Sequence, residues 1–275
     1  MQYNEITILD TAAAAGFFTT RNATANARRT ALAEQAKTFG GTIAWPHLVH
    51  GTHIVQLTEE HLGKGLLELP DTDGCITDVP GIALTVTCGD CLPIYLFDPQ
   101  HQAIGLAHAG WKGTLGGIAA SLVAAMQKAY GTDPARLIGR VCPGISPCCF
   151  QVRKDCYEQF TDKYYWSEEF LYRLPDGTHT LDLKGINLQL LQLCGVEDLK
   201  ASTRCTCCEP ESFYSYRRCG DQDRMLAYFY RKPQNGEPGF LPSLGVSRCL
   251  LGEPCRYDGL SKPDETVKRL GQHYY

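Results

Sequence analysis

The chain has 275 residues, of which 44% are hydrophobic and 20% charged, and its formal net charge is −4 at pH 7. This balance is typical of a globular protein, and it gives no electrostatic reason to expect nucleic acid or an anionic membrane as the main partner. The first ten residues, MQYNEITILD, lack the basic and apolar regions of a signal peptide, and no apolar run is long enough to span a bilayer. We therefore expect a cytoplasmic protein.

The order of apolar and turn residues predicts a mixture of helices and strands. Expected helices have alanine or leucine at helical spacing and end at glycines, whereas expected strands are β-branched and bounded by turn residues. In chain order, the predicted elements are a helix over 26–41, strands over 52–58 and 81–89, a hairpin over 92–110 whose second strand ends at His108, a helix over 114–131, a strand over 135–146 and a helix over 181–196. The elements follow no strict βαβ period, which indicates an α/β or α+β fold with a mixed sheet.

A stretch rich in proline and glycine, RKPQNGEPG at 231–239, is the expected domain boundary. No internal repeat precedes it. The sequence therefore predicts one domain over residues 1–235 and a C-terminal extension over residues 236–275.

Fourteen cysteines are many for a protein without a signal peptide. The missing signal peptide and the chain length both disfavour a secreted disulfide framework, so we expect most thiols to be buried as small hydrophobic side chains. The sequence CTCC at 205–208 has the form of half a zinc site, but no second CxxC lies at the spacing of a zinc finger. Packing is therefore the expected role of these cysteines.

Three residues near predicted strand ends could bind a catalytic metal. They are His50 in HLVHGTHIVQL, Cys91 in TCGDCLP and His108 in AHAGW. His47 and His53 lie in the same segment as His50, but residues three apart on a strand point to opposite faces, so all three histidines cannot converge there. Two histidines and one cysteine with an open fourth position are typical of catalytic zinc. The separation of the three residues matches no known ligand spacing, so ordinary polar and packing roles remain the alternative.

Two further segments indicate an anionic substrate. Gly113, Gly116 and Gly117 open the predicted helix over 114–131, where backbone N–H groups attract anions, and Lys112 adds a positive charge. The alternative for these glycines is a tight turn with close helix packing.

The second segment is FYSYRRCGDQDR at 213–224, in which arginines lie beside tyrosines. Arg217, Arg218 and Arg224 can bind phosphate or carboxylate through two parallel hydrogen bonds, and a neighbouring tyrosine can stack on a ring. Such a cluster is more often a solvated surface, but together with an anion-binding helix start it indicates a phosphorylated or anionic substrate.

Several blocks resemble the multicopper polyphenol oxidase, or laccase-domain, family, whose members are now mostly described as purine nucleoside phosphorylases. They occur in the family's order from about Ala15 to Tyr230, and AHAGW after a DC-P strand is specific to that family. The matching blocks are HLVHGTHIV, DGCITDVPGIALTVTCGDCLPIYLFDP, IGLAHAGWKGTLGGI, PGISPCCFQV, LDLKGINLQLL and FYSYRR. The resemblance implies a single-domain α/β/β/α sandwich with mixed sheets, and a zinc or copper ion held by His50, Cys91 and His108.

The resemblance also implies a reaction. Family members phosphorolyse adenosine, inosine and methylthioadenosine and deaminate adenosine, so the expected partners are a nucleoside and phosphate. The expected phosphate-binding residues are Arg21, Lys112, Arg217 and Arg218. A laccase label fits poorly, because multicopper sites need many histidines and this chain has eight. Either a monomer or a homodimer is expected.

Two other functions are alternatives. Some bacterial relatives are assigned to peptidoglycan precursor editing, in which Cys91 would be a nucleophile and His108 its base, without a metal. A module that holds a metal and a ligand without turnover is the third hypothesis.

The sequence departs from the family pattern in three places. The loop TTRNATANARR around Arg21 is shortened, and Cys219 stands where the family has an acidic residue. Residues 244–265 match none of the blocks and resemble the opening of a separate, uncharacterised small domain.

Overall fold

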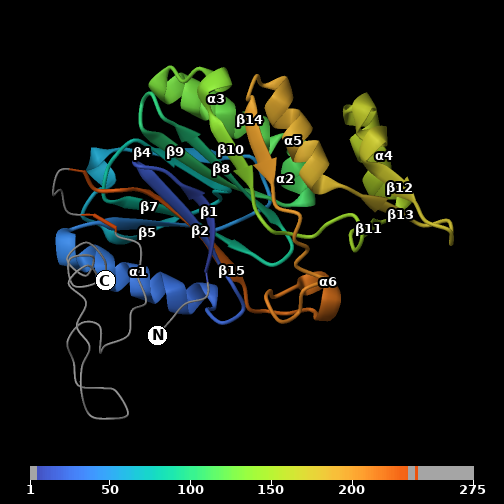
Figure 1. The fold of residues 1–275 in the computed structure, drawn as a ribbon, viewed down its shortest axis with the longest axis horizontal. Helices are drawn as coiled ribbons and strands as arrows, with labels where there is room; N and C mark the ends of the chain where they lie inside the picture. The colour runs from blue at the N-terminus through green and yellow to red at the C-terminus, as the bar shows by residue number, and fades with distance from the viewer. Residues whose placement is uncertain (1–4, 235–238, 241–275) are drawn as a thin grey trace, which may run out of the picture.

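The computed structural model describes residues 5–234 and 239–240, and in these residues two six-stranded sheets pack between layers of helices (Figure 1). The helices are α1 (Ala25–Phe39), α2 (Trp111–Gly116), α3 (Ile118–Tyr130), α4 (Lys154–Lys163), α5 (Leu183–Leu193) and α6 (Tyr216–Cys219). Short 3₁₀ helices cover Glu59–His61, Pro134–Arg136 and Tyr165–Phe170.

The first sheet joins segments from both ends of the described chain. Its order is β1 (Glu5–Asp10), β2 (Ala14–Thr19), β15 (Met225–Arg231), β7 (Ile82–Cys88), β3 (Thr42–Pro46) and β5 (Gly65–Leu69). Strand β3 pairs in parallel with β5 and β7, whereas the pairs from β1 through β7 are antiparallel. The sheet is therefore mixed, as the irregular order of the predicted elements indicated.

The second sheet is also mixed. Its order is β14 (Asp198–Ala201), β10 (Ile138–Val141), β8 (Leu92–Asp98), β9 (Ala103–Ala109), β6 (Gly74–Thr77) and β4 (Ile54–Leu57). Strands β8 and β9 form the antiparallel hairpin predicted over 92–110, and its second strand continues one residue past His108. A small third sheet contains β11 (Gln151–Val152), β13 (His179–Leu181) and β12 (Leu171–Arg173).

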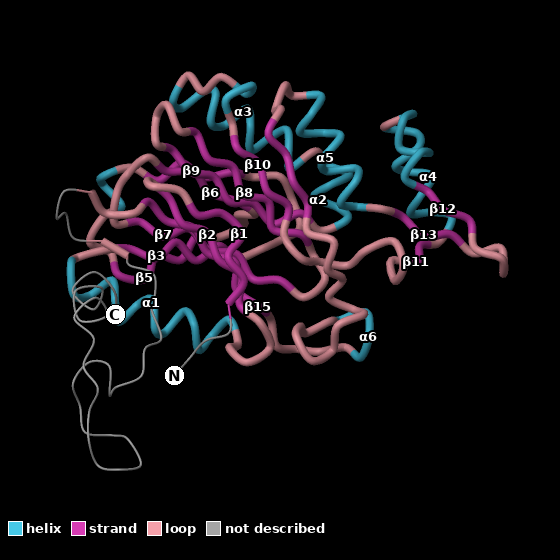
Figure 2. The backbone as a smooth tube through the Cα atoms, viewed as in Figure 1, coloured by secondary structure: helices cyan, strands magenta, loops and turns pink. Residues whose placement is uncertain are grey.

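Three apolar cores hold the layers together. Leu84 and Val86 of the first sheet meet Tyr95 and Leu106 of the second in the central core. Helix α1 covers the outer face of the first sheet, and α3 and α5 cover the outer face of the second, with the strands between them (Figure 2). Both faces of β8 and β9 are buried, which explains their nearly continuous apolar sequence. The predicted α/β/β/α sandwich with mixed sheets is confirmed.

The helix predicted over 114–131 is wrong at its start. Helix α2 already begins at Trp111, and Gly117 separates it from α3 with a φ of +94°, in the left-handed region that favours glycine. A Cβ atom at Gly113 would lie 3.0 Å from the Gly51 carbonyl oxygen, and one at Gly116 would lie 2.7 Å from the Thr52 Cγ2 atom. Gly113 and Gly116 therefore lie inside α2 and serve close packing, and of the three predicted glycines Gly117 opens a helix, as the N-cap of α3.

The C-terminal extension predicted over 236–275 lies outside the described residues except for two of them. One of these, Phe240, is buried and packs edge to face on Phe39 of α1, with ring centroids 5.0 Å apart. The domain boundary stays a prediction. Within the described residues, no helix is both long and apolar enough to cross a membrane.

Candidate active site

The connection between β7 and β8 carries Cys91 from one sheet to the other. Residues 89–91 make this crossing in a tight turn, and Asp90 has a φ of +88°. Hydrogen bonds hold the strained residue: the Thr206 hydroxyl donates to one Asp90 carboxylate oxygen over 2.6 Å, and the backbone N–H of Arg217 donates to the other over 2.7 Å. The turn thereby places Cys91 at the end of the two sheets.

Asp73 positions both histidines that lie beside Cys91. Its carboxylate accepts the backbone N–H groups of His50 and Gly51 over 2.9 and 2.7 Å, which holds His50 at a φ of +62°. The same carboxylate lies 3.2 Å from His108 Nδ1. With Nδ1 donating to Asp73, the Nε2 atom of His108 is available as a ligand, as in many metal sites where a carboxylate orients the histidine.

His50, Cys91 and His108 come together, and their donor atoms all lie within 4.8 Å of one another. The two imidazole rings lie edge to face with centroids 4.9 Å apart. A Cβ atom at Gly110 would lie 2.8 Å from His50 Cδ2 and 3.1 Å from Cys91 Sγ, so the small residue leaves room for the cluster. Two imidazoles and one thiolate fit a metal ion with an open position for substrate or water.

The electrostatics of the site favour charged forms of its members. Burial raises the pKa of the Cys91 thiol, but the charge and hydrogen bond of His108 outweigh burial and lower this pKa to about 6. Burial lowers the pKa of His108, yet the Cys91 thiolate and the hydrogen bond to Asp73 raise it to about 9. Burial also opposes charge on Asp73, but hydrogen bonds from His108 and Gly51 lower its pKa. Without a metal, the three residues form a thiolate–imidazolium–carboxylate array.

A cavity of about 540 Å³ opens above the three candidate ligands. This volume suits a small organic ligand. The cavity is lined by Leu48, His50, Thr87, Gly89, Asp90, Cys91, His108, Gly110, Trp111, Ile145, Phe150, Leu183, Tyr216, Arg217 and Arg224. The walls thus combine aromatic rings, aliphatic side chains and two arginines with the polar cluster.

The two arginines of the cavity pair with no carboxylate among the described residues. Arg217 donates to the carbonyl oxygens of Cys149 and Gln151 over 2.9 and 3.0 Å, and its guanidinium lies 5.1 Å from the Phe150 ring centroid. Arg224 donates to backbone carbonyls, one of them at Asp223 over 2.9 Å. Among the described residues, neither arginine is in an ion pair, so both can attract an anion.

The other three predicted phosphate-binding residues lie elsewhere. Arg21 and Arg218 both contact the Asp221 carboxylate, over 3.8 and 3.2 Å. Arg218 also donates to backbone carbonyls, which gives it a structural role in its loop. Lys112 is exposed and lies over the Trp111 indole, 5.6 Å from the ring centroid, beside a separate surface hollow. Arg217 is the predicted residue that lines the cavity.

Asp73, which orients His50 and His108, was not predicted from the sequence as a site residue. Its one signal is an acidic side chain between turn residues in PDTDGC, and that signal does not identify a partner 35 residues away in the chain. Trp111 and Phe150 were likewise not predicted as cavity walls, because α2 was expected to start later and Phe150 lies in a loop without regular periodicity.

Similar proteins have names that point to nucleoside chemistry. A purine nucleoside phosphorylase, YlmD of Geobacillus stearothermophilus, is 35% identical over 194 residues, which cover 68% of this chain and 71% of that protein. A purine nucleoside phosphorylase of Deinococcus radiodurans is 36% identical over 192 residues, covering 70% and 71%. Adenosine deaminase RL5, from an unknown prokaryotic organism, is 30% identical over 198 residues, covering 69% and 75%.

Solved structures share the fold. The crystal structure of YlmD from Geobacillus stearothermophilus aligns with a TM-score of 0.71 at 30% identity, over 81% of this chain and 93% of that one. The hypothetical protein YfiH of Bacillus licheniformis aligns with a TM-score of 0.72 at 29% identity, over 79% and 92%. A family model described as multi-copper polyphenol oxidoreductase laccase matches residues 17–232. The chain belongs to this family.

Proposed function

We propose that the protein is a metal-dependent purine nucleoside phosphorylase with adenosine deaminase activity, and that the cavity above His50, Cys91 and His108 is its active site. The observation that carries the proposal is the meeting of three metal-binding side chains with unpaired arginines and aromatic walls in one cavity. The names of the relatives support the same two reactions. The substrates would be a purine nucleoside and inorganic phosphate.

Zinc is the metal that the donor set favours. Two imidazoles and one thiolate with an open position match catalytic zinc sites. Copper electron-transfer sites add an axial methionine or a similar ligand, and among the described residues no methionine lines this cavity. A bound zinc ion would supply Lewis acidity at its open position. The zinc ligands would be His50, Cys91 and His108.

In phosphorolysis, a phosphate oxygen forms a bond to the anomeric carbon of the ribose while the glycosidic bond breaks and the purine leaves with a proton. Arg217 and Arg224 would bind and orient the phosphate, since guanidinium groups pair with phosphate oxygens through parallel hydrogen bonds. Trp111 and Phe150 would bind the flat purine and exclude water from it. Holding both reactants together lowers the entropic part of the barrier.

In deamination, water adds to the purine ring carbon that bears the amino group, and ammonia leaves. The reaction needs no phosphate, so the arginines contribute less to it than to phosphorolysis. Substitution of Arg217 should therefore separate the two reactions that the cavity is proposed to perform.

The test is product analysis on the purified, zinc-loaded protein. Inosine with phosphate should yield hypoxanthine and ribose 1-phosphate, with no hypoxanthine when phosphate is left out, and adenosine should yield ammonia with or without phosphate. Cys91→Ala should abolish both reactions, whereas the matched control Cys194→Ala, at the end of α5 and away from the cavity, should keep both. Full activity of Cys91→Ala would contradict the proposal.

One observation favours a second candidate. His108 lies between Cys91 and Asp73, which is the arrangement of nucleophile, base and orienting carboxylate that hydrolases use. In that case Cys91 would attack an amide carbonyl, such as that of a cell-wall precursor, and no metal would be needed. A chelator separates the candidates: it should abolish phosphorolysis by a zinc enzyme, and it should leave a metal-free cysteine hydrolase fully active.

A further inference from the structure

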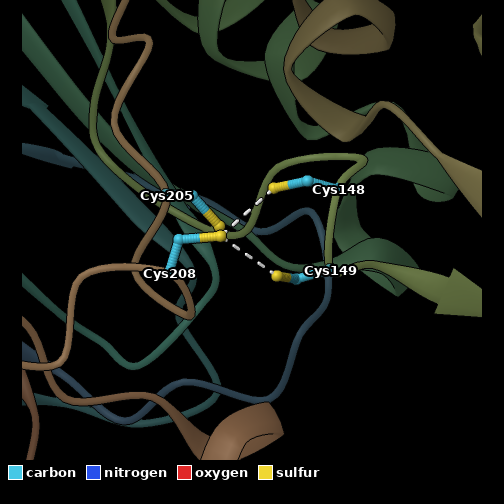
Figure 3. A group of neighbouring side chains, drawn as sticks. All are labelled: Cys148, Cys149, Cys205 and Cys208. Atoms are coloured by element: carbon cyan, nitrogen blue, oxygen red, sulfur yellow. Dashed lines mark hydrogen bonds between the residues drawn. The ribbon is translucent and has the colours of Figure 1, made fainter.

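Four cysteines lie together outside the candidate active site (Figure 3). Cys148 and Cys149 belong to the loop between β10 and β11, and Cys205 and Cys208 to the loop after β14. Their sulfur atoms all lie within 4.8 Å of one another. All four thiols are free. We call these four residues the tetracysteine cluster.

The sulfur spacing fits a metal better than a disulfide. Cys208 Sγ lies 3.5 Å from Cys148 Sγ and 3.3 Å from Cys149 Sγ. A tetrahedral zinc ion with Zn–S bonds of about 2.3 Å separates its ligand sulfurs by about 3.8 Å. A disulfide would need about 2.05 Å. One ion among the four sulfurs therefore requires only small shifts of side chains.

A backbone N–H group points at the buried sulfur of the cluster. The N–H of Ser146 donates to Cys205 Sγ over 3.4 Å. Cys205 and Cys208 are the ends of a CxxC turn, the spacing common in structural zinc sites. A backbone donor of this kind stabilises a thiolate bound to a metal.

A buried cation beside the cluster is a further independent observation. The side chain of Lys184 on α5 donates to the Ser146 hydroxyl over 2.8 Å and to the Arg204 carbonyl over 2.6 Å. Within the described residues it contacts no carboxylate. The charges that act on it come from Cys205, Asp182, Cys148 and Glu209. Four thiolates around a divalent ion carry a net charge of −2, of which the ammonium group would offset one unit.

We propose that the tetracysteine cluster binds one structural zinc ion. Each thiol loses its proton on binding, so four thiolates complete a closed tetrahedral shell without an open position. The ion would fasten the loop that contains Cys149, whose carbonyl holds Arg217, to the loop that contains Thr206, whose hydroxyl holds Asp90. It would thus stabilise one wall of the cavity. The sequence did not predict this zinc site, because its two pairs of cysteines lie on separate loops and not at the spacing of a zinc finger.

The proposal does not depend on the proposed function. It is tested on a variant in which the cavity cluster (His50, Cys91 and His108) lacks one of its three ligands, so that zinc at the tetracysteine cluster is measured separately. The protein to analyse is Cys91→Ala, which removes a ligand of the other cluster. Elemental analysis of this variant, purified with a reductant and without a metal-binding tag, should give one zinc per chain. X-ray absorption should show a first shell of sulfur only, at about 2.3 Å. Cys91→Ala with Cys208→Ser should lose this zinc at least tenfold more readily to a chelator, and Cys91→Ala with Cys194→Ser should not.

Two results would overturn the proposal. One is a Cys91→Ala protein without zinc whose four thiols react freely with an alkylating reagent even after zinc is added. The other is a first shell that contains nitrogen or oxygen in place of sulfur. Because both are measured on Cys91→Ala, they do not depend on whether the Cys208→Ser variant folds. Cys208→His, which restores a ligand, should recover zinc binding.

Discussion

The two clusters of metal-binding side chains differ in how much of a metal's coordination shell they would fill. His50, Cys91 and His108 supply three donors and lie at the bottom of a cavity of about 540 Å³. The tetracysteine cluster supplies four sulfurs, and none of its members lines that cavity. Three donors leave a position for substrate, whereas four close the shell. The donor count therefore assigns chemistry to the first cluster and stability to the second.

One residue connects the clusters. The backbone N–H of Arg217 donates to Asp90, next to Cys91, and its guanidinium donates to the carbonyl of Cys149. The same side chain lines the cavity and forms no ion pair within the part of the chain that the structure describes. A zinc ion bound by the tetracysteine cluster would thus help to position a group in the proposed active site.

The largest expected effect is a loss of activity when a ligand of the cavity cluster is removed, compared with a loss of stability when a member of the tetracysteine cluster is replaced. His108→Ala removes a ligand of the cavity and should lower kcat/KM for inosine phosphorolysis by about 10³-fold or more, since electrostatic stabilisation of the transition state is lost. Cys208→Ser should lower the temperature of unfolding and leave measurable turnover at low temperature. Steady-state kinetics and thermal unfolding of both variants check this contrast. Equal losses of activity would remove the distinction between the clusters.

Asp73→Asn should lower the zinc affinity of the cavity cluster and leave that of the tetracysteine cluster unchanged. The amide keeps the size of the side chain but weakens the hold on His50 and His108, so the affinity of the cavity for zinc should fall by about 10- to 100-fold. The zinc of the tetracysteine cluster should be retained. A chelator titration that resolves two classes of zinc measures both. An unchanged affinity of the weaker class would show that Asp73 does not orient the ligands.

Arg217→Ala should lower kcat/KM for phosphate more than it changes the KM for the nucleoside. A hydrogen bond to a charged group contributes about 1.5–3 kcal/mol, which corresponds to a loss of roughly 10- to 150-fold in kcat/KM for phosphate. The KM for inosine and the rate of adenosine deamination should change much less. Arg136→Ala, an exposed arginine in a 3₁₀ helix away from the cavity, is the matched control. A variant that loses both reactions equally would assign Arg217 a structural role.

The smallest expected effect concerns stability at a place remote from both clusters. The buried Asp98 carboxylate accepts the Thr132 hydroxyl over 2.6 Å and backbone N–H groups of the β8–β9 turn. Burial raises the pKa of Asp98, but the bonds from Thr132 and His101 outweigh burial and lower it below its ordinary value of 3.8. The stabilisation is therefore complete above the unfolded value and is lost as the pH falls through the folded one.

Asp98→Asn should consequently cost about 1–3 kcal/mol of unfolding free energy at neutral pH. The difference from the wild type should shrink in acid below pH 3.8. Urea unfolding at several pH values measures it, and zinc content should not change. A difference that stays constant in acid would contradict the assigned role of the charge.

Local patterns in the sequence predicted the mixed sheet and several of its elements, whereas the α/β/β/α layering was expected from the family resemblance. The β8–β9 hairpin and α5, which starts at its Asp182 cap, lie where apolar periodicity and turn residues indicated. The start of α2 was missed, since glycines at 113 and 116 look like a helix start although close packing against the 51–52 backbone requires them.

The sites were less predictable than the fold. His50, Cys91 and His108 come from three loops or strand ends, and spacing alone could not join them; the family resemblance did. No family argument pointed to the tetracysteine cluster. Its two halves meet because β10 and β14 pair in parallel and the loops after them lie side by side. Strand pairing of this kind depends on the whole sheet, so it cannot be predicted from either cysteine segment alone.

The most direct test of the central claim is inosine phosphorolysis by the wild type and Cys91→Ala, with the zinc content of each sample measured before the assay. We expect two zinc ions per chain and phosphate-dependent hypoxanthine release for the wild type. For Cys91→Ala we expect one zinc ion and no release. A wild type that lacks zinc at the cavity and releases no hypoxanthine would contradict the proposed function and favour the cysteine–histidine hydrolase.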